Sequence, residues 1–175
     1  MRLALVSLQR MSELEIPFCL FCHQRAGWRT RRFFSWISRV GDGHYFYAVL
    51  LALLFIDGWA ALPAIGQAAV VGFTCHFLYR QLKSGTARVR PFETAGFDPT
   101  VPALDKYSFP SGHTLHALSF ALVICAHYAF LGWLLFPFAA LVALSRVVLG
   151  LHFPTDVVAG AALGATIAGL SSLLF

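Results

Sequence analysis

Charge is what this chain lacks most. Only 12% of its 175 residues are Asp, Glu, Lys or Arg, whereas 58% are hydrophobic. A soluble domain of this size would carry about 25% charged residues, so the composition excludes an ordinary soluble protein. We predict one integral membrane bundle rather than two separate domains.

Cysteine is also scarce, and the four that are present do not form a disulfide framework. Cys75 and Cys125 lie within apolar runs, as small core residues do. The other two form Cys19-Leu-Phe-Cys22-His23, which has the spacing of a c-type haem attachment site. Haem would need export of this segment and a second axial ligand, and a metal or redox pair is a further alternative. The apolar surroundings favour chance spacing, so we expect no cofactor and no metal.

The first 43 residues lack an apolar run long enough to cross a bilayer, which takes about 20 residues. The run Leu3–Leu8 is also too short for the apolar part of a cleavable signal peptide, about 7–15 residues, so no such peptide is evident. The segment is instead basic and amphipathic, with Trp28 and Trp36 among five arginines between positions 25 and 39. This pattern is typical of a helix in the headgroup plane. The net charge of +5 therefore indicates bilayer lipids, and no nucleic acid, as the partner.

Five apolar runs follow the turn Gly41-Asp42-Gly43, over about residues 45–59, 62–79, 114–130, 131–144 and 157–175. The first two have almost no loop between them and should form a tight antiparallel hairpin. The last run is rich in glycine and alanine, which allows close helix contact in a bilayer. We predict an all-α polytopic membrane helix bundle, with about five transmembrane helices and an N-terminal interfacial amphipathic helix. Residues 1–43 form the interfacial segment and residues 44–175 the transmembrane domain.

Polar chemistry is concentrated in three short segments, each at the end of an apolar run: residues 83–91, 110–113 and 145–156. Charged groups beside hydrocarbon are expensive, so these residues are functional candidates. The first segment follows the second run, the second precedes the third run, and the third separates the last two runs. If all five runs cross the bilayer, the three segments lie on one side. The spacing therefore predicts one shared site at one interface.

The first two segments carry groups that suit phosphate binding. Lys83, Arg88 and Arg90 are cations, and the arginine fork pairs bidentately with phosphate oxygens. In Pro110-Ser111-Gly112-His113, the serine is a candidate N-cap of a helix whose free backbone N–H groups attract anions. His113 lies in that first turn and could donate a proton to a departing oxygen. The alternatives are a solvated basic loop and a capped helix with a headgroup histidine.

The third segment combines Arg146 with His152 and Asp156. A carboxylate that holds a histidine tautomer is typical of an activated nucleophile. The four-residue separation can place His152 and Asp156 on one helical face, although Pro154 is expected to begin the last helix between them. Arg146 would bind the same phosphate. A buried structural His–Asp pair is the alternative interpretation.

In this order, the patterns Lys-x6-Arg-Pro, Pro-Ser-Gly-His and Ser-Arg-x5-His-x3-Asp resemble the three signatures of the type 2 phosphatidic acid phosphatase (PAP2) superfamily, over residues 83–156. The resemblance implies a metal-independent phosphatase that works through a phosphohistidine. It makes His152 the nucleophile, Asp156 its orienting carboxylate and His113 the proton donor. It assigns phosphate binding to Lys83, Arg90, Ser111, Gly112 and Arg146.

Several polar residues fall outside these signatures. Arg88 has no position in them and is interpreted as a peripheral cation. Asp42 and Asp105 are interpreted as structural, although Asp42 could help shape the substrate entrance and Asp105 could touch the site. Bacterial membrane members of the family usually resemble six-helix proteins, whereas here a short basic segment stands in place of the first spanning helix.

We therefore expect a membrane phosphatase acting on a lipid phosphate. Undecaprenyl diphosphate is the first choice of substrate, followed by phosphatidylglycerophosphate and phosphatidic acid. Vanadate-dependent haloperoxidases share the constellation but resemble soluble proteins, and a lipid-phosphate or anion transporter would not need a nucleophile with an acid. The resemblance indicates a bacterial inner membrane with the site facing the periplasm, whereas the count of basic residues favours the cytoplasm. The oligomeric state is left open.

Overall fold

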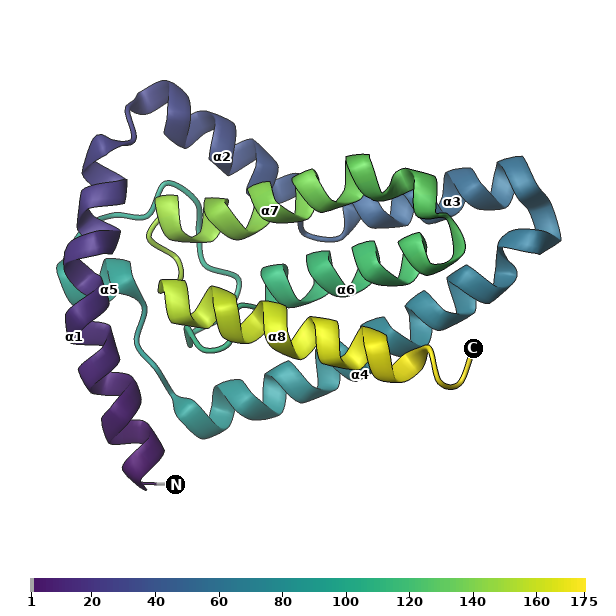
Figure 1. Ribbon diagram of the computed structural model, residues 1–175. Coiled ribbons are helices and arrows are strands. Elements are labelled where there is room, and N and C mark those ends of the chain that lie inside the picture. The colour runs from purple at the N-terminus through teal and green to yellow at the C-terminus, as the bar shows by residue number, and fades with distance from the viewer. Residues whose placement is uncertain (1) are drawn as a thin grey trace.

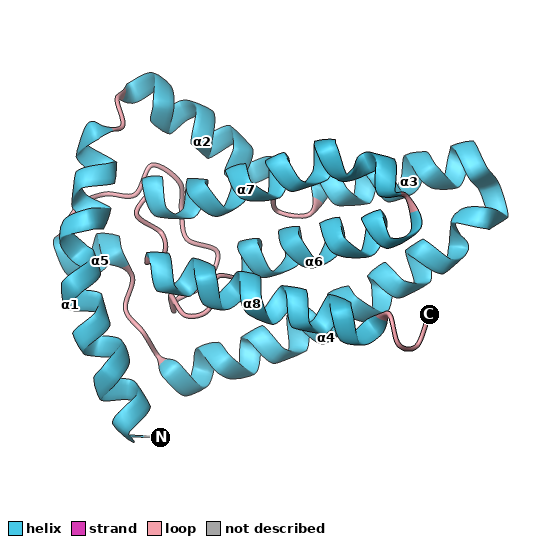
Figure 2. Cartoon of the chain, in the orientation of Figure 1, coloured by secondary structure: helices cyan, strands magenta, loops and turns pink. Residues whose placement is uncertain are grey.

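The computed structural model describes the backbone of residues 2–175 and the side chains from residue 8 onward. All regular secondary structure in this part of the chain is helical (Figure 2). The elements are α1 (Arg2–Arg25), α2 (Trp28–Val40), α3 (His44–Asp57), η1 (Gly58–Ala61), α4 (Leu62–Thr86), α5 (Pro91–Ala95), α6 (Gly112–His127), η2 (Ala129–Leu131), α7 (Gly132–Val148) and α8 (Pro154–Ser171). The prediction of an all-α fold is confirmed.

The five apolar runs correspond to α3, α4, α6, α7 and α8. Two helical stretches, His44–Ala95 and Ala129–Val148, are long and apolar enough to cross a membrane, and Gly112–His127 is a shorter apolar helix. Large apolar side chains such as Phe55, Trp59 and Trp133 are more than three-quarters exposed, as lipid-facing residues are. The chain is a membrane protein, and the number of helices that cross the bilayer stays a prediction.

Helix α6 lies at the centre of the bundle and packs most extensively against α8 (Figure 1). Glycines make this contact close, because a Cβ on Gly160 or Gly164 would come within 2.5 Å of the Ser111 or Leu115 carbonyl oxygen. The expectation from the small residues of the last run is therefore met. This contact also joins the second polar segment to the third.

The prediction that the first two apolar runs form a tight antiparallel hairpin is wrong. The one-turn η1 does connect α3 directly to α4, but the two helices diverge from this turn (Figure 1). The reason is that α6 packs against both of them. The ring centroids of Phe46 on α3 and Phe120 on α6 lie 5.7 Å apart.

The N-terminal segment forms two helices, not the single interfacial helix that was predicted. They meet at Ala26 and Gly27, where the Arg31 guanidinium donates to the carbonyls of His23 (2.7 Å) and Ala26 (2.8 Å). A cation on the last carbonyls of a helix satisfies groups that the ended helix leaves free. Helix α1 crosses one end of the bundle, and α2 packs against α7 (Figure 1). Trp28 and Trp36 on α2 are exposed.

Candidate active site

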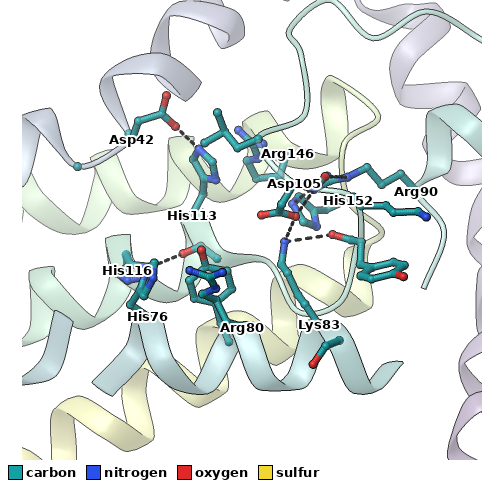
Figure 3. A pocket seen from close by; sticks show the side chains of 18 of the residues that line it. Asp42, His76, Arg80, Lys83, Arg90, Asp105, His113, His116, Arg146 and His152 are labelled. Carbon is teal, nitrogen blue, oxygen red and sulfur yellow. Dashed lines mark hydrogen bonds and ion pairs between the residues drawn. The ribbon is translucent and has the colours of Figure 1, made fainter. Parts of the chain in front are cut away.

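Residues of all three polar segments line one cavity of about 570 Å³ (Figure 3). Of the eight residues predicted from the sequence, six reach it: Lys83, Arg90, Gly112, His113, Arg146 and His152. They come from the end of α4, the loop after it, the start of α6, the end of α7 and the α7–α8 loop. Segments up to 70 residues apart in the sequence therefore share one site, as their spacing relative to the apolar runs predicted.

His152 is fixed in the short loop between α7 and α8. Its backbone N–H donates to the Arg146 carbonyl at 3.0 Å, and its side chain is buried. The ring nitrogen Nε2 lies 3.3 Å from a guanidinium nitrogen of Arg90, and Nδ1 lies 3.6 Å from Oδ2 of Asp156. Nδ1 has no closer partner in the described part of the chain. Nε2 thus faces the cationic side of the cavity, and Nδ1 faces the carboxylate.

The surroundings of His152 favour the neutral imidazole. Burial, followed by the charges of Arg90, Arg146 and Lys83, holds the pKa of His152 well below its usual value. Burial and nearby cations both disfavour a protonated ring. A neutral ring retains the lone pair that a nucleophile needs.

Asp156 is completely buried behind this loop as the third residue of α8, which begins at Pro154 as predicted. Its Oδ2 accepts from the Phe153 backbone N–H at 2.8 Å and from the Ser108 hydroxyl. Its Oδ1 accepts from Arg88 at 2.6 Å. A carboxylate with this many donors is held in one orientation, and that orientation faces His152.

Arg88 is not the peripheral cation that the sequence suggested. It is 5% exposed and contacts Asp156, and its guanidinium also donates to Glu15 at 2.9 Å and to Thr155 at 2.7 Å. In a regular strand, residues two apart share one face, but residues 88–90 form neither helix nor strand. Arg90 lines the cavity, while Arg88 reaches Asp156 from behind.

The Asp105 carboxylate lies between the side chains of Lys83 and Arg90, two of the three cations of the first segment. Its Oδ1 accepts from Lys83 and, at 2.9 Å, from Arg90, and the three side chains lie together in Figure 3. Burial opposes its ionisation, but the hydrogen bond from Lys83 and the charges of Lys83 and Arg90 outweigh burial and lower the pKa of Asp105. A carboxylate thus occupies the place where two of the cations predicted to bind phosphate converge.

Arg146 faces the same cavity from the end of α7 and is 2% exposed. One guanidinium nitrogen donates to the Ser38 hydroxyl of α2. Its Nε has no hydrogen-bond partner in the described part of the chain. A buried donor without a partner is costly, and a phosphate oxygen is the kind of acceptor that would satisfy it.

Ser111 and Gly112 form the start of α6. Ser111 is the N-cap, as predicted, with its hydroxyl accepting from the Thr114 backbone N–H at 3.5 Å. It is buried and does not line the cavity, and its own N–H donates to the Asp156 carbonyl at 3.0 Å. Gly112 does line the cavity, one residue before His113. The helix N-terminus therefore opens toward the cations.

His113 contacts a carboxylate that the sequence did not assign to the site. Its Nε2 is hydrogen-bonded to Asp42 (Figure 3), which lies in the Gly-Asp-Gly turn between α2 and α3. The turn was visible in the sequence, but nothing local indicated a partner 71 residues away. Ser38 and Glu15 were missed for the same reason.

The Cys19-Leu-Phe-Cys22-His23 pattern does not line the cavity. No group of three or more metal-binding side chains was found among the described residues. Cys19 is buried, and burial raises the pKa of its thiol to about 12. The His23 ring is stacked on Phe97, with centroids 4.1 Å apart. These contacts give the cysteine and the histidine ordinary packing roles.

Comparisons with known proteins agree on one family. Residues 60–175 match the model of the PAP2 superfamily. Over 140 residues the chain is 34% identical to an undecaprenyl-diphosphatase of Sulfolobus acidocaldarius, covering 77% of this chain and 66% of that protein. Over 125 residues it is 32% identical to the bacitracin transport permease protein BcrC of Bacillus licheniformis, covering 69% and 60%. The chain thus spans less than two thirds of the length of these two relatives.

A solved structure shares the fold of almost the whole chain. It is the crystal structure of a transmembrane PAP2 type phosphatidylglycerolphosphate phosphatase from Bacillus subtilis, with a TM-score of 0.75 and 24% sequence identity. The match covers 98% of this chain and 92% of that one. The N-terminal helices are therefore included in the shared fold.

Proposed function

This chain belongs to the PAP2 superfamily, and we propose that it is a metal-independent membrane phosphatase that removes a terminal phosphate or diphosphate group from a lipid. The observation that carries the proposal is the meeting of Lys83, Arg90, Arg146, His113 and His152 in one cavity. Three cations there would neutralise the phosphoryl oxygens, which is the role of Mg²⁺ in many other phosphatases. The lipid tails stay in the bilayer while the headgroup enters.

The phosphate binds where Asp105 now pairs with Lys83 and Arg90. The fork of Arg90 and the free Nε of Arg146 donate to equatorial oxygens, and the start of α6 at Ser111 and Gly112 adds backbone donors. Donors fixed in advance around the developing charge are the main catalytic contribution. His152 Nε2 already lies beside Arg90, at the edge of this anion site.

In the first step, His152 Nε2 attacks phosphorus in line with the bond to the lipid oxygen. A phosphorus–nitrogen bond forms, the phosphorus–oxygen bond breaks, and protonated His113 gives its proton to the leaving oxygen. Asp156 balances the positive charge that develops on the His152 ring. In the second step water attacks phosphorus, the phosphorus–nitrogen bond to His152 breaks, and the now neutral His113 accepts the proton of that water. Free phosphate leaves, and both histidines return to their starting states.

Undecaprenyl diphosphate is the substrate that we favour, ahead of phosphatidylglycerophosphate and phosphatidic acid. One similar protein is named for that activity, and all three lipids present a terminal phosphate next to an apolar tail. Another relative is named as a transport permease. A carrier would need the cations but not a buried nucleophile paired with an acid, so hydrolysis is the better account of the site.

Release of inorganic phosphate by the detergent-purified protein tests the proposal. We expect hydrolysis of at least one of the three lipids, retention of activity in EDTA, and inhibition by vanadate, which mimics the five-coordinate phosphoryl state. Loss in EDTA with recovery on adding Mg²⁺ would overturn the metal-independent mechanism. Binding of lipid phosphate without any release would favour transport.

We place residues 1–43 at the membrane interface and residues 44–175 in the phosphatase domain, in a bacterial inner membrane with the cavity facing the periplasm. Thr100 is exposed in the loop near the cavity end of the bundle, so it reports this orientation. In a variant without the four native cysteines, Thr100→Cys should react with a membrane-impermeant maleimide in intact spheroplasts. Labelling only after lysis would place the site in the cytoplasm.

A further inference from the structure

The turn between α2 and α3 is shaped to present Asp42 to the cavity. Gly41 packs so closely on α7 that a Cβ there would lie 2.7 Å from a methyl group of Val142. Gly43 has a φ of +110°, a conformation that favours glycine. The Asp42 backbone N–H donates to the Arg39 carbonyl at 3.2 Å. The residue between the two glycines is thereby held with its carboxylate against the ring of His113.

We propose that Asp42 is a positioning residue for the acid step: its carboxylate orients His113 and stabilises the protonated ring that gives its proton to the leaving oxygen. The inference rests on the proposed role of His113 as proton donor. The pairing repeats, on the leaving-group side, the arrangement of Asp156 with His152 on the nucleophile side. Each of the two histidines that we assign to the reaction therefore has its own carboxylate.

The two ring nitrogens of His113 have different roles in the acid step. Nε2 donates its proton to Asp42 and keeps it throughout. Nδ1 has no hydrogen-bond partner in the described part of the chain, and the side chain lines the cavity. The proton on Nδ1 moves to the oxygen of the breaking phosphorus–oxygen bond, and the ring becomes neutral. The water of the second step returns a proton to the same nitrogen.

The charges around His113 explain why a carboxylate is needed. Burial of the ring and the charges of Arg146 on α7 and Lys83 on α4 act against its protonation, and Asp42 acts as the opposing negative charge. Nearby cations disfavour a protonated imidazole, whereas an adjacent carboxylate favours it. Without Asp42, the cations that bind the phosphate would oppose protonation of His113, and this ring could not act as the acid.

The test compares two substrates that differ in their need for an acid. Phosphatidic acid with short acyl chains loses an alkoxide and needs the proton, whereas p-nitrophenyl phosphate loses a stable phenolate and does not. We expect Asp42→Asn to lower kcat for phosphatidic acid by about 100-fold, the usual size of a general-acid effect. We expect kcat for p-nitrophenyl phosphate to fall less than about threefold, KM to change little, and Asp42→Glu to restore part of the loss.

The controls separate this inference from the proposed function. Asp57→Asn changes the exposed acid at the far end of α3 and should leave both rates unchanged. His113→Ala should show the same substrate-selective loss, and a loss shared equally by both substrates would overturn the acid role itself. If His113→Ala is selective while Asp42→Asn is not, only the role of Asp42 is overturned. Equal loss on both substrates in Asp42→Asn would reduce it to a structural contact.

Discussion

The motif-bearing half of the chain and its N-terminal helices contribute to the cavity in different ways. Residues 83–156 supply the groups that would touch phosphate, namely Lys83, Arg90, His113, Arg146 and His152. The first 43 residues supply partners to those groups: Ser38 to Arg146, Asp42 to His113, and Glu15 to Arg88 behind Asp156. A segment that looks like a membrane anchor in the sequence thus also holds the reactive side chains in place.

The largest effect is expected from the motif half. His152→Ala removes the only group that we assign to attack phosphorus, so phosphate release and the phosphoenzyme should both disappear. Acid-quench trapping with a ³²P-labelled lipid phosphate measures the intermediate. Near-normal turnover by this variant would show that another group is the nucleophile.

The second-largest effect is expected at Arg88, which lies within residues 83–156 but outside the three PAP2 signatures. Arg88→Met removes a buried partner of Asp156 and should lower kcat by about 100-fold, as misplacement of a catalytic group by about 1 Å does. The free energy of unfolding should fall by about 3 kcal/mol, because a buried carboxylate loses its cation. Chemical denaturation in detergent and steady-state kinetics check the two values. An unchanged kcat would show that Arg88 does not position Asp156 for the reaction.

A smaller effect is expected from the N-terminal helices. Glu15 accepts from Arg88, from the Thr155 hydroxyl at 2.7 Å and from the Thr155 backbone N–H at 2.8 Å. Glu15→Gln keeps one acceptor and should lower stability by about 1.5 kcal/mol and kcat by less than about tenfold. Glu13→Gln on the same helix is the matched control. If Glu15→Gln changes only membrane attachment, α1 is an anchor and nothing more.

The smallest effect is a change of stability with pH. His152 is held neutral in the folded protein, with its pKa well below the usual value, whereas in the unfolded chain it titrates at about 6.5. The unfolded state therefore binds more protons below that pH, and stability should fall as the pH drops from about 6.5 toward 5. Thermal unfolding of the wild type and of His152→Gln measures this slope. Equal slopes in both proteins would assign the effect to other groups.

Local sequence signals predicted most of the fold, and most of the predicted site residues line the cavity. The apolar runs located α3, α4, α6, α7 and α8, Pro154 marked the start of α8, and Ser111 marked the cap of α6. What failed depends on contacts between distant residues. The splay of α3 from α4 follows from the insertion of α6, which hydropathy does not encode.

The partners of the catalytic groups could not be predicted for a similar reason. Arg88 and Asp156 are separated by 68 residues, and Asp42 and His113 by 71. Local patterns such as apolar periodicity and helix capping do not indicate contacts between residues this far apart in the sequence.

Gly160 and Gly164 of α8 set a distance rather than a conformation. A methyl group at Gly160 would collide with the Ser111 carbonyl oxygen, so α8 would have to move away from α6. Asp156 lies one turn before Gly160, and His152 lies in the loop just before α8. Because Gly160 has no side chain, α8 can pack closely on α6. This close contact sets the distance between His152, the proposed nucleophile, and the start of α6. The exposed side of α8, which includes Val158, has no such contact with α6, so substitutions there should leave this distance unchanged.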